Sequence, residues 1–140
     1  MDKDVIQFFR ENRFMNIATD GIKLWVSKVY YALDNGIIFF LEKNSLTNKN
    51  IEKNNNVSFN IDQSLLTIIV QGTGKINILG NPDNFRDKTD IIIKKNPEDK
   101  KFVNHVYIAE LIPDFISITD LRKEFKKYNP VFSLNEFNEL

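Results

Sequence analysis

Few residues in this 140-residue chain can do chemistry by themselves. The chain contains no Cys and a single His, which excludes cysteine nucleophiles, thiolate zinc sites and His-rich metal sites. That residue, His105, stands among apolar residues and has no recognisable catalytic partner in the sequence. This setting favours an ordinary hydrogen-bonded histidine over an acid or base. We therefore expect no metal site and identify no catalytic residue, so any reactivity must come from a bound group.

A polar segment at residues 43–53 holds the other candidate groups. Ser45 and Thr47 favour the start of a helix, and Lys49 follows in the same segment. The simplest interpretation is that the hydroxyls cap the helix and the lysine is solvated. Hydroxyls, an ammonium group and free backbone N–H groups at a helix start are also what a phosphate dianion needs when it leaves water. The capping and binding roles do not exclude each other.

Composition and charge limit the class of protein. With 42% hydrophobic and 12% aromatic residues, the chain can form one compact domain over residues 1–140. The 19 Lys and Arg residues are balanced by 19 Asp and Glu residues, which argues against a protein that mainly neutralises nucleic-acid phosphates. No apolar run has the length of a membrane helix, and the N-terminal residues do not resemble a signal peptide. We expect a cytoplasmic protein with no membrane or nucleic-acid partner.

The elements that must position these groups follow from hydrophobic periodicity and turn residues. Amphipathic patterns predict a helix over residues 2–12, a short helix within 43–53, and a helix from Asn81 onward. Period-two and apolar runs predict strands over residues 14–19, 22–33, 37–42, 57–61, 66–79, 105–111 and 115–119. The tail from 121 to 140 is left unassigned.

Three glycine-containing turns or interruptions connect these strands. Asp20-Gly21 is a hairpin signal, and Asn35-Gly36 is a stronger one because both residues accept the positive φ of a type I′ turn. Gly72-Thr73-Gly74 interrupts a strand, which indicates a bulge or the close approach of another backbone or ligand. About seven short strands with tight connections predict a mainly β fold with flanking helices. A small antiparallel barrel is favoured over a sandwich or a doubly wound sheet.

The order of these elements resembles a known family. The resemblance rests on a strand ending Ala18-Thr19-Asp20-Gly21, a hairpin at Asn35-Gly36, the loop Thr47-Asn48-Lys49, the segment Asn54–Phe59 and a strand with Gly72. Over roughly residues 5–120, this pattern is similar to the FMN-binding split-barrel family related to pyridoxamine 5′-phosphate oxidase. The resemblance implies a six- to seven-stranded antiparallel split β-barrel, FMN as cofactor, and a homodimer with the flavin between the two chains.

The resemblance also implies a set of cofactor-binding residues. Thr47, Asn48 and Lys49 match the family's Ser/Thr-Arg-Lys stretch that holds the flavin phosphate, with Asn48 in place of the usual Arg. The strand beginning at Trp25 matches the one that runs beside the flavin ring, and Gln71 can reach the ring edge. The implied cofactor-binding residues are Trp25, Val26, Ser27, Lys28, Leu41, Ser45, Thr47, Asn48, Lys49 and Gln71. They imply a flavin-dependent oxidoreductase.

The substrate and electron donor are not identified by the sequence. The substrate-binding C-terminal Arg and Trp of the oxidases have no counterpart, since the last Arg is Arg122 and the only Trp is Trp25. Three alternatives stay open. One is a split barrel that binds a deazaflavin or haem, and another is a non-enzymatic dimer, flavin-binding or ligand-free, that acts as an electron carrier, store or sensor. The third, a nucleic-acid-binding barrel, is disfavoured by the balanced charge.

Overall fold

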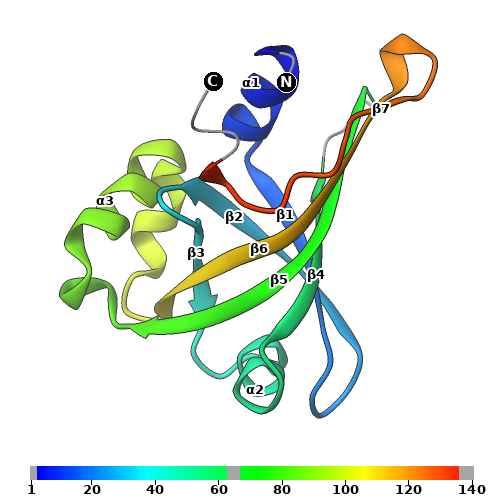
Figure 1. Ribbon diagram of the computed structural model, residues 1–140. Helices are drawn as coiled ribbons and strands as arrows, with labels where there is room; N and C mark the ends of the chain where they lie inside the picture. Colours follow the sequence, from blue (N-terminus) through cyan, green and yellow to red (C-terminus); the bar gives the residue numbers. More distant parts are fainter. Residues whose placement is uncertain (1–2, 63–66, 136–140) are drawn as a thin grey trace.

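The computed structural model describes residues 3–62 and 67–135, and within them the strands form one antiparallel barrel (Figure 1). The strand order is β3-β2-β1-β4-β5-β6-β7, and a further pairing of β3 with β6 closes the first six strands into a barrel. The strands are β1 (Phe14–Thr19), β2 (Trp25–Leu33), β3 (Ile37–Glu42), β4 (Asn56–Asp62), β5 (Ile68–Gly80), β6 (Val106–Asp120) and the short β7 (Lys126–Lys127). The predicted fold class, a six- to seven-stranded split barrel with flanking helices, is confirmed.

Helices cover the two ends and one side of the barrel. They are α1 (Lys3–Glu11), α2 (Leu46–Lys53), α3 (Arg86–Lys95) and the 3-10 helices η1 (Pro82–Asn84), η2 (Pro97–Phe102) and η3 (Leu121–Lys123). In Figure 1, α1 lies at one end of the barrel, α2 lies at the other, and α3 lies beside β2 and β3. None of the described helices has both the length and the apolar character needed to cross a membrane.

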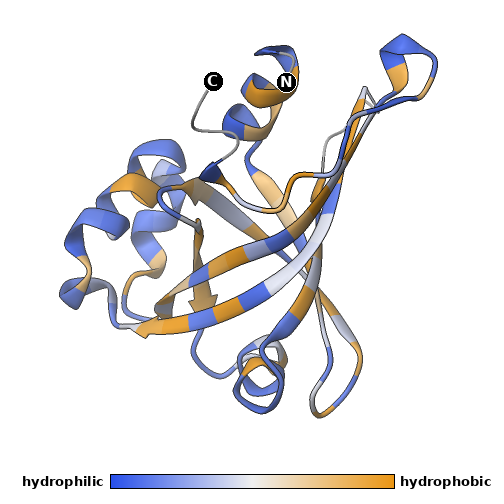
Figure 2. Ribbon diagram, in the orientation of Figure 1, coloured by the Kyte–Doolittle hydropathy of each residue, from blue (hydrophilic) through white to orange (hydrophobic). Residues whose placement is uncertain are grey.

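The continuous apolar run of β3 is explained by burial on both faces. Ile37, Phe39 and Leu41 point into the main core inside the barrel, where they join residues from every other long strand and from α1. The alternate residues Ile38 and Phe40 belong to a second cluster outside the barrel, which includes Ile92 of α3. Figure 2 shows this difference as alternating colours on the longer strands and a largely hydrophobic β3, which ends in Glu42. Helix α3 therefore anchors its segment of the chain against the outer face of β3.

The split in the barrel lies between β2 and β3. These strands pair only from Tyr31 opposite Phe39 to Leu33 opposite Ile37. The preceding half of β2, residues 25–30, pairs with β1 on one edge, from Trp25 opposite Thr19 to Tyr30 opposite Phe14. In the described chain its other edge has no strand partner. Backbone donors and acceptors along this edge are therefore available to another group.

Several element boundaries differ from those predicted. Strand β2 begins at Trp25 rather than residue 22, because residues 20–24 form the loop of the β1–β2 hairpin. The predicted strands 105–111 and 115–119 are one continuous strand, β6, with Pro113 inside it. A register shift between Thr73 and Gly74 in the facing strand β5 accompanies this proline. The bulge inferred from the glycines is thus present, and the close neighbour is the β6 backbone.

The hairpin at Asn35-Gly36 is confirmed, but the type I′ turn is wrong. Neither residue has a positive φ, and the backbone N–H of Asp34 donates to the carbonyl of Gly36 at 2.9 Å. Glycine is required here for space, since a Cβ at Gly36 would lie 2.7 Å from Cγ of Glu110. The ends of the predicted first helix and fifth strand at Asp2 and Leu66, and tail residues 136–140, lie outside the described residues.

Candidate functional site

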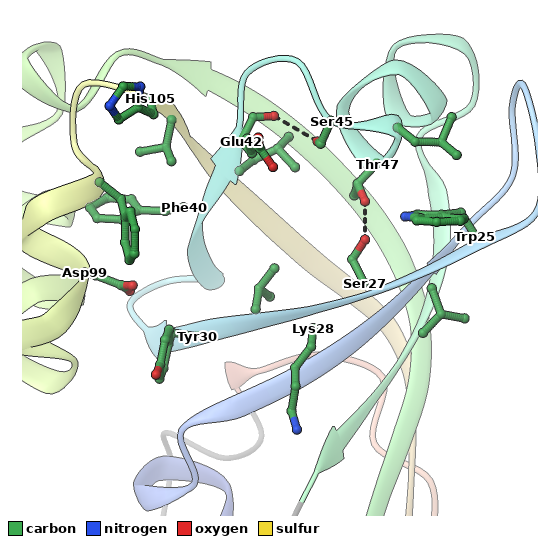
Figure 3. Close-up of a pocket in the computed structure, with 16 residues that line it drawn as sticks. Trp25, Ser27, Lys28, Tyr30, Phe40, Glu42, Ser45, Thr47, Asp99 and His105 are labelled. Carbon is green, nitrogen blue, oxygen red and sulfur yellow. Dashed lines mark hydrogen bonds between the residues drawn. The ribbon is translucent and has the colours of Figure 1, made fainter.

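A pocket of about 860 Å³ opens where β2 and β3 diverge (Figure 3). Its walls come from the free edge of β2, the end of β3, the start of α2, and η2 with the turn that follows it. Its size lies within the range of cofactor and small-molecule sites. Three hydroxyl side chains lie on one side of it, and one carboxylate with two aromatic rings lies on the opposite side. We call them the hydroxyl end (Ser27, Ser45 and Thr47) and the carboxylate end (Asp99 with Phe40 and Phe102).

The hydroxyl end joins β2 to the start of α2. A short hydrogen bond joins the hydroxyl of Ser27 on β2 to the hydroxyl of Thr47 (Figure 3). Thr47 is a buried residue, with 3% of its surface exposed. Ser45 is the N-cap: its Oγ accepts from the backbone N–H of Asn48 at 3.1 Å and donates to the carbonyl of Glu42 at 2.9 Å. These bonds fix two hydroxyl groups beside the positive end of the helix dipole.

Free backbone N–H groups add to the hydroxyl end. The first intrahelical hydrogen bond of α2 runs from the N–H of Lys49 to the carbonyl of Ser45, at 3.1 Å. The preceding amides, at Leu46 and Thr47, belong to the first turn, which has no intrahelical acceptors. Both residues line the pocket. This combination of hydroxyls and helix N-terminal amides suits an anion.

The middle of the pocket is the unpaired edge of β2. Ser27 points toward α2, whereas the ammonium of Lys28 points away and lies 4.9 Å from the centre of the Phe14 ring on β1 (Figure 3). This alternation is what a β-strand imposes on successive side chains. Trp25 lies beside Thr47 in Figure 3 and is 45% exposed. A flat ligand along this edge would meet backbone groups at its rim and apolar side chains on its faces.

The carboxylate end is built from η2. Asp99 lines the pocket, is only 4% exposed, and its Oδ2 has no hydrogen-bond partner among the described residues. Burial raises the pKa of Asp99 to about 6, although the positive charge of Arg13 acts in the opposite direction. Phe40 from β3 and Phe102 from η2 line the same pocket. At neutral pH this end therefore holds a buried carboxylate that is mostly ionised.

A network around Arg13 fixes η2 against β2. The guanidinium of Arg13 forms an ion pair with Glu98, donates from Nε to Oδ1 of Asn96 at 3.2 Å, and lies 5.1 Å from the centre of the Tyr30 ring. Asn96 is fully buried and donates to the carbonyl of Tyr31 at 3.2 Å. The backbone N–H of Asp99 donates to the carbonyl of Asn96 at 3.0 Å. The position of Asp99 is thus set by a buried asparagine.

The residues proposed from the sequence separate into two groups. Seven of them line the pocket: Trp25, Val26, Ser27, Lys28, Leu41, Ser45 and Thr47. The other three lie elsewhere. Asn48 is buried with its amide donating to the carbonyl of Lys43, Lys49 is exposed on α2, and Gln71 is exposed on β5, where it pairs with Asn60 and Ser117.

Sequence reasoning missed Asp99. The segment Asn96-Pro97-Glu98-Asp99 carries a helix-start signal, and acids in a first turn are common for reasons unrelated to binding. No local pattern shows that one of the two acids faces a strand far away in the sequence. His105 also lines the pocket, and its backbone carbonyl accepts from the N–H of Lys43 at 3.0 Å.

The barrel is similar to solved structures of low sequence identity. A FAD-binding protein from Mesorhizobium loti has a TM-score of 0.65 and 17% identity, covering 84% of this chain and 94% of that one. A NimC/NimA family protein from Clostridium acetobutylicum has a TM-score of 0.66 and 12% identity, covering 92% of each chain. A heme-binding protein from Mycobacterium smegmatis has a TM-score of 0.66 and 13% identity, covering 77% of this chain and 49% of its own.

These similarities establish the split-barrel fold that this chain shares with proteins of different functions. No protein-family model matches the sequence, and no curated protein sequence is significantly similar to it.

Proposed function

We propose that the pocket between β2 and β3 binds FMN, with the phosphate at the hydroxyl end and the ring along the free edge of β2. The observation that carries the proposal is the unpaired edge of residues 25–30, which ends beside the start of α2. A flavin needs a flat apolar slot, hydrogen-bonding groups at the ring edge and an anion site at a fixed distance. The proposal is supported by one continuous pocket that joins the free edge of β2, apolar lining residues and the start of α2.

The phosphate would be held by hydroxyls and amides rather than by a cluster of cations. Thr47 supplies a hydroxyl group and the first-turn amides of α2 supply N–H donors, while Ser45, whose single hydroxyl proton is donated to the carbonyl of Glu42, caps the helix. Thr47 can donate to a phosphate while it accepts from Ser27, because a hydroxyl is both donor and acceptor. Lys49 lies in solvent, from where its charge contributes at longer range. Asn48 is engaged with Lys43, so direct phosphate contact centres on Thr47.

The proposed activity is that of a flavin-dependent oxidoreductase similar to pyridoxamine 5′-phosphate oxidase, with an unidentified substrate. A bound flavin supplies hydride or electron transfer, and the chain orients the ring and limits its contact with water. The FAD-binding neighbour from Mesorhizobium loti supports a flavin in this fold. The absence of cysteine and the single histidine agree with a protein whose reactive group is the cofactor.

The pocket is proposed to be completed by a second copy of the chain. Leu24, Trp25 and Val26 are 76%, 45% and 65% exposed, and Trp25 and Val26 line the open side of the pocket. Burying such neighbouring apolar side chains in a symmetric contact removes them from water. Val26→Glu should therefore convert a dimer to a monomer in sedimentation experiments. A wild-type monomer that binds FMN fully would contradict the shared site.

Haem is a second candidate ligand, favoured by one specific residue. His105 lines the pocket and is exposed, so its imidazole is accessible to a ligand iron. A heme-binding protein is among the structural neighbours. Haem binding through His105 assigns no role to the hydroxyl end, whereas FMN binding does. FMN is therefore the preferred ligand.

The visible spectrum of the protein distinguishes these ligands. We expect protein mixed with FMN and then desalted to retain flavin absorption bands, and protein mixed with haemin to show no Soret shift. Flavin retention without haemin binding supports the proposal. A protein that retains haemin through His105, so that His105→Ala abolishes the shift, and binds no FMN would overturn it.

A further inference from the structure

The carboxylate end contains a polar group that the proposed FMN contacts leave unused. Oδ2 of Asp99 is buried and has no hydrogen-bond partner among the described residues. It is one of only two such side-chain atoms there, the other being Oδ1 of Asn48, a residue that does not line the pocket. Buried carboxylate oxygens are rarely left unsatisfied, because each costs the desolvation of a charged acceptor. An unsatisfied acceptor in a pocket indicates a missing donor.

The nearby cation does not supply that donor. Arg13 is the charge that acts on Asp99, but its guanidinium is held by the ion pair with Glu98 and the hydrogen bond to Asn96. The backbone of Asp99 is fixed by its own hydrogen bond to the carbonyl of Asn96. The carboxylate is therefore held in place on the pocket side of η2 without being neutralised by a direct hydrogen bond.

The surroundings define the shape of the missing donor. Phe40, which is 9% exposed, and Phe102 line the pocket with Asp99 (Figure 3). Aromatic walls favour a flat group, and their negatively polarised faces also favour a positive charge. In Figure 3 the Asp99 side chain lies across the pocket from the Ser27–Thr47 hydrogen bond. A group bound at Asp99 therefore lies away from the anion site.

We propose that the carboxylate end is a subsite for a flat, positively charged nitrogen group, such as an amidinium or a protonated nitrogen heterocycle, which donates an N–H hydrogen bond to Asp99. This inference names a class of ligand for the pocket. It rests on the proposed function only in one respect, which is that the same pocket is the binding site. A charge-assisted N–H bond to the carboxylate replaces the water lost on burial. The ligand contributes the charge, and the fixed acid selects for it.

Three probes of the same shape and different charge test this subsite. Benzamidine is cationic, benzamide is neutral and benzoate is anionic, and each can be titrated calorimetrically at pH 7.5 into the protein as purified and after saturation with FMN. We expect benzamidine to bind at least tenfold more tightly than benzamide, and benzoate to bind most weakly. Equal affinities for benzamidine and benzamide would overturn the proposal, because they would show that no charge is selected.

Asp99→Asn is the decisive variant, since it keeps the size of the side chain and removes its charge. It should reduce benzamidine affinity to that of benzamide, while Asp114→Asn, on an exposed acid that accepts from Thr73, should leave the preference unchanged. A benzamidine preference that persists in Asp99→Asn would contradict the assignment. FMN affinity is measured in the same samples. If the wild type prefers benzamidine but does not bind FMN, the proposed function alone is contradicted. If the wild type binds FMN but does not prefer benzamidine, this inference alone is contradicted.

Discussion

The two ends of the pocket show opposite ways of placing polar groups. At the hydroxyl end, Ser27, Ser45 and Thr47 are satisfied by one another and by the backbone, with Ser45 capping α2 and Thr47 bonded to Ser27. At the carboxylate end, Asp99 is held just as firmly but has an oxygen without a partner. The first arrangement stabilises the empty protein, whereas the second destabilises it until a donor arrives. The difference indicates that binding at the carboxylate end depends more on ligand charge.

The strongest expected effect comes from the buried asparagine that anchors the β1–β2 loop to α2. Asn50 on α2 accepts from the N–H of Ile22 at 2.7 Å and donates to the carbonyl of Lys23 at 2.6 Å and to Thr19 at 3.1 Å. Asn50→Ala leaves these loop groups unpaired, so we expect a loss of about 2–3 kcal/mol in the free energy of unfolding. Urea denaturation measures it.

The matched control is Asn56→Ala, an exposed asparagine whose side chain bonds only to nearby Asn54 in the described chain. It should change the free energy of unfolding by less than about 0.5 kcal/mol. Equal losses in the two variants would show that Asn50 does not anchor the β1–β2 loop to α2.

Thr47→Val tests the hydroxyl end as a ligand site. The variant keeps the volume of the side chain and removes its hydroxyl, so FMN should bind about 10- to 100-fold more weakly, as expected for one hydrogen bond to a charged group. Riboflavin, which has no phosphate, should lose much less affinity. Fluorescence titration gives both dissociation constants, and Thr73→Val, at an exposed residue of β5, is the control. Equal losses of affinity for FMN and riboflavin would contradict the assignment of the phosphate to the hydroxyl end.

Asp99→Asn tests the unsatisfied state of the carboxylate end through pH. The pKa of Asp99 rises from 3.8 to about 6 on folding, so between about pH 4 and 6 the folded protein keeps a proton that the unfolded chain has released. The free energy of unfolding of the wild type therefore falls as pH rises through this range. The variant cannot ionise at this position, so its free energy of unfolding does not fall in this way. The free energy of unfolding of the variant minus that of the wild type should therefore be about 1–2 kcal/mol larger at pH 7.5 than at pH 4.

Thermal unfolding of both proteins across this pH range measures the difference. A constant stability difference between wild type and Asp99→Asn from pH 4 to 7.5 would show that the carboxylate is not destabilised by burial. The two ends of the pocket would then not differ in how well their polar groups are satisfied.

Lys49→Ala has the smallest expected effect. The ammonium is exposed on α2 and outside the pocket lining, and solvent and salt screen its action on a bound phosphate. FMN affinity should fall by about twofold at low salt and by less at high salt. A tenfold or greater loss for FMN alone would make Lys49 a direct phosphate ligand.

The fold could be predicted from the sequence where the signal is local. The alternation of β1 and β4, the hairpins and the cap at Ser45 are local patterns, and each lies where the periodicity and turn residues placed it. The merging of two predicted strands into β6 could not be found, because the register shift that accompanies Pro113 is supplied by the partner strand β5. The start of β2 likewise depends on Asn50, which binds the β1–β2 loop from another element.

The residues of the candidate site also differ in whether local sequence or distant contacts determine their positions. The hydroxyl end lies within one strand and one helix start, and Ser27, Ser45 and Thr47 could be selected from the sequence by resemblance. Lys49 lies two residues after Thr47 on α2 and Gln71 lies on the separate strand β5, and both are exposed outside the pocket lining, because the face a side chain occupies depends on its position in the helix or strand. Asp99 could not be found because its position depends on Asn96 and Arg13, which join η2 to β2 and to the residue before β1 in the folded chain only.

The most direct test of the central claim is the ratio of FMN to riboflavin affinity in the wild-type protein. Quenching of flavin fluorescence on titration gives both dissociation constants under the same conditions. A pocket that holds the phosphate at the start of α2 predicts that FMN binds at least tenfold more tightly than riboflavin. Equal affinities, or no quenching by either flavin, would contradict the account.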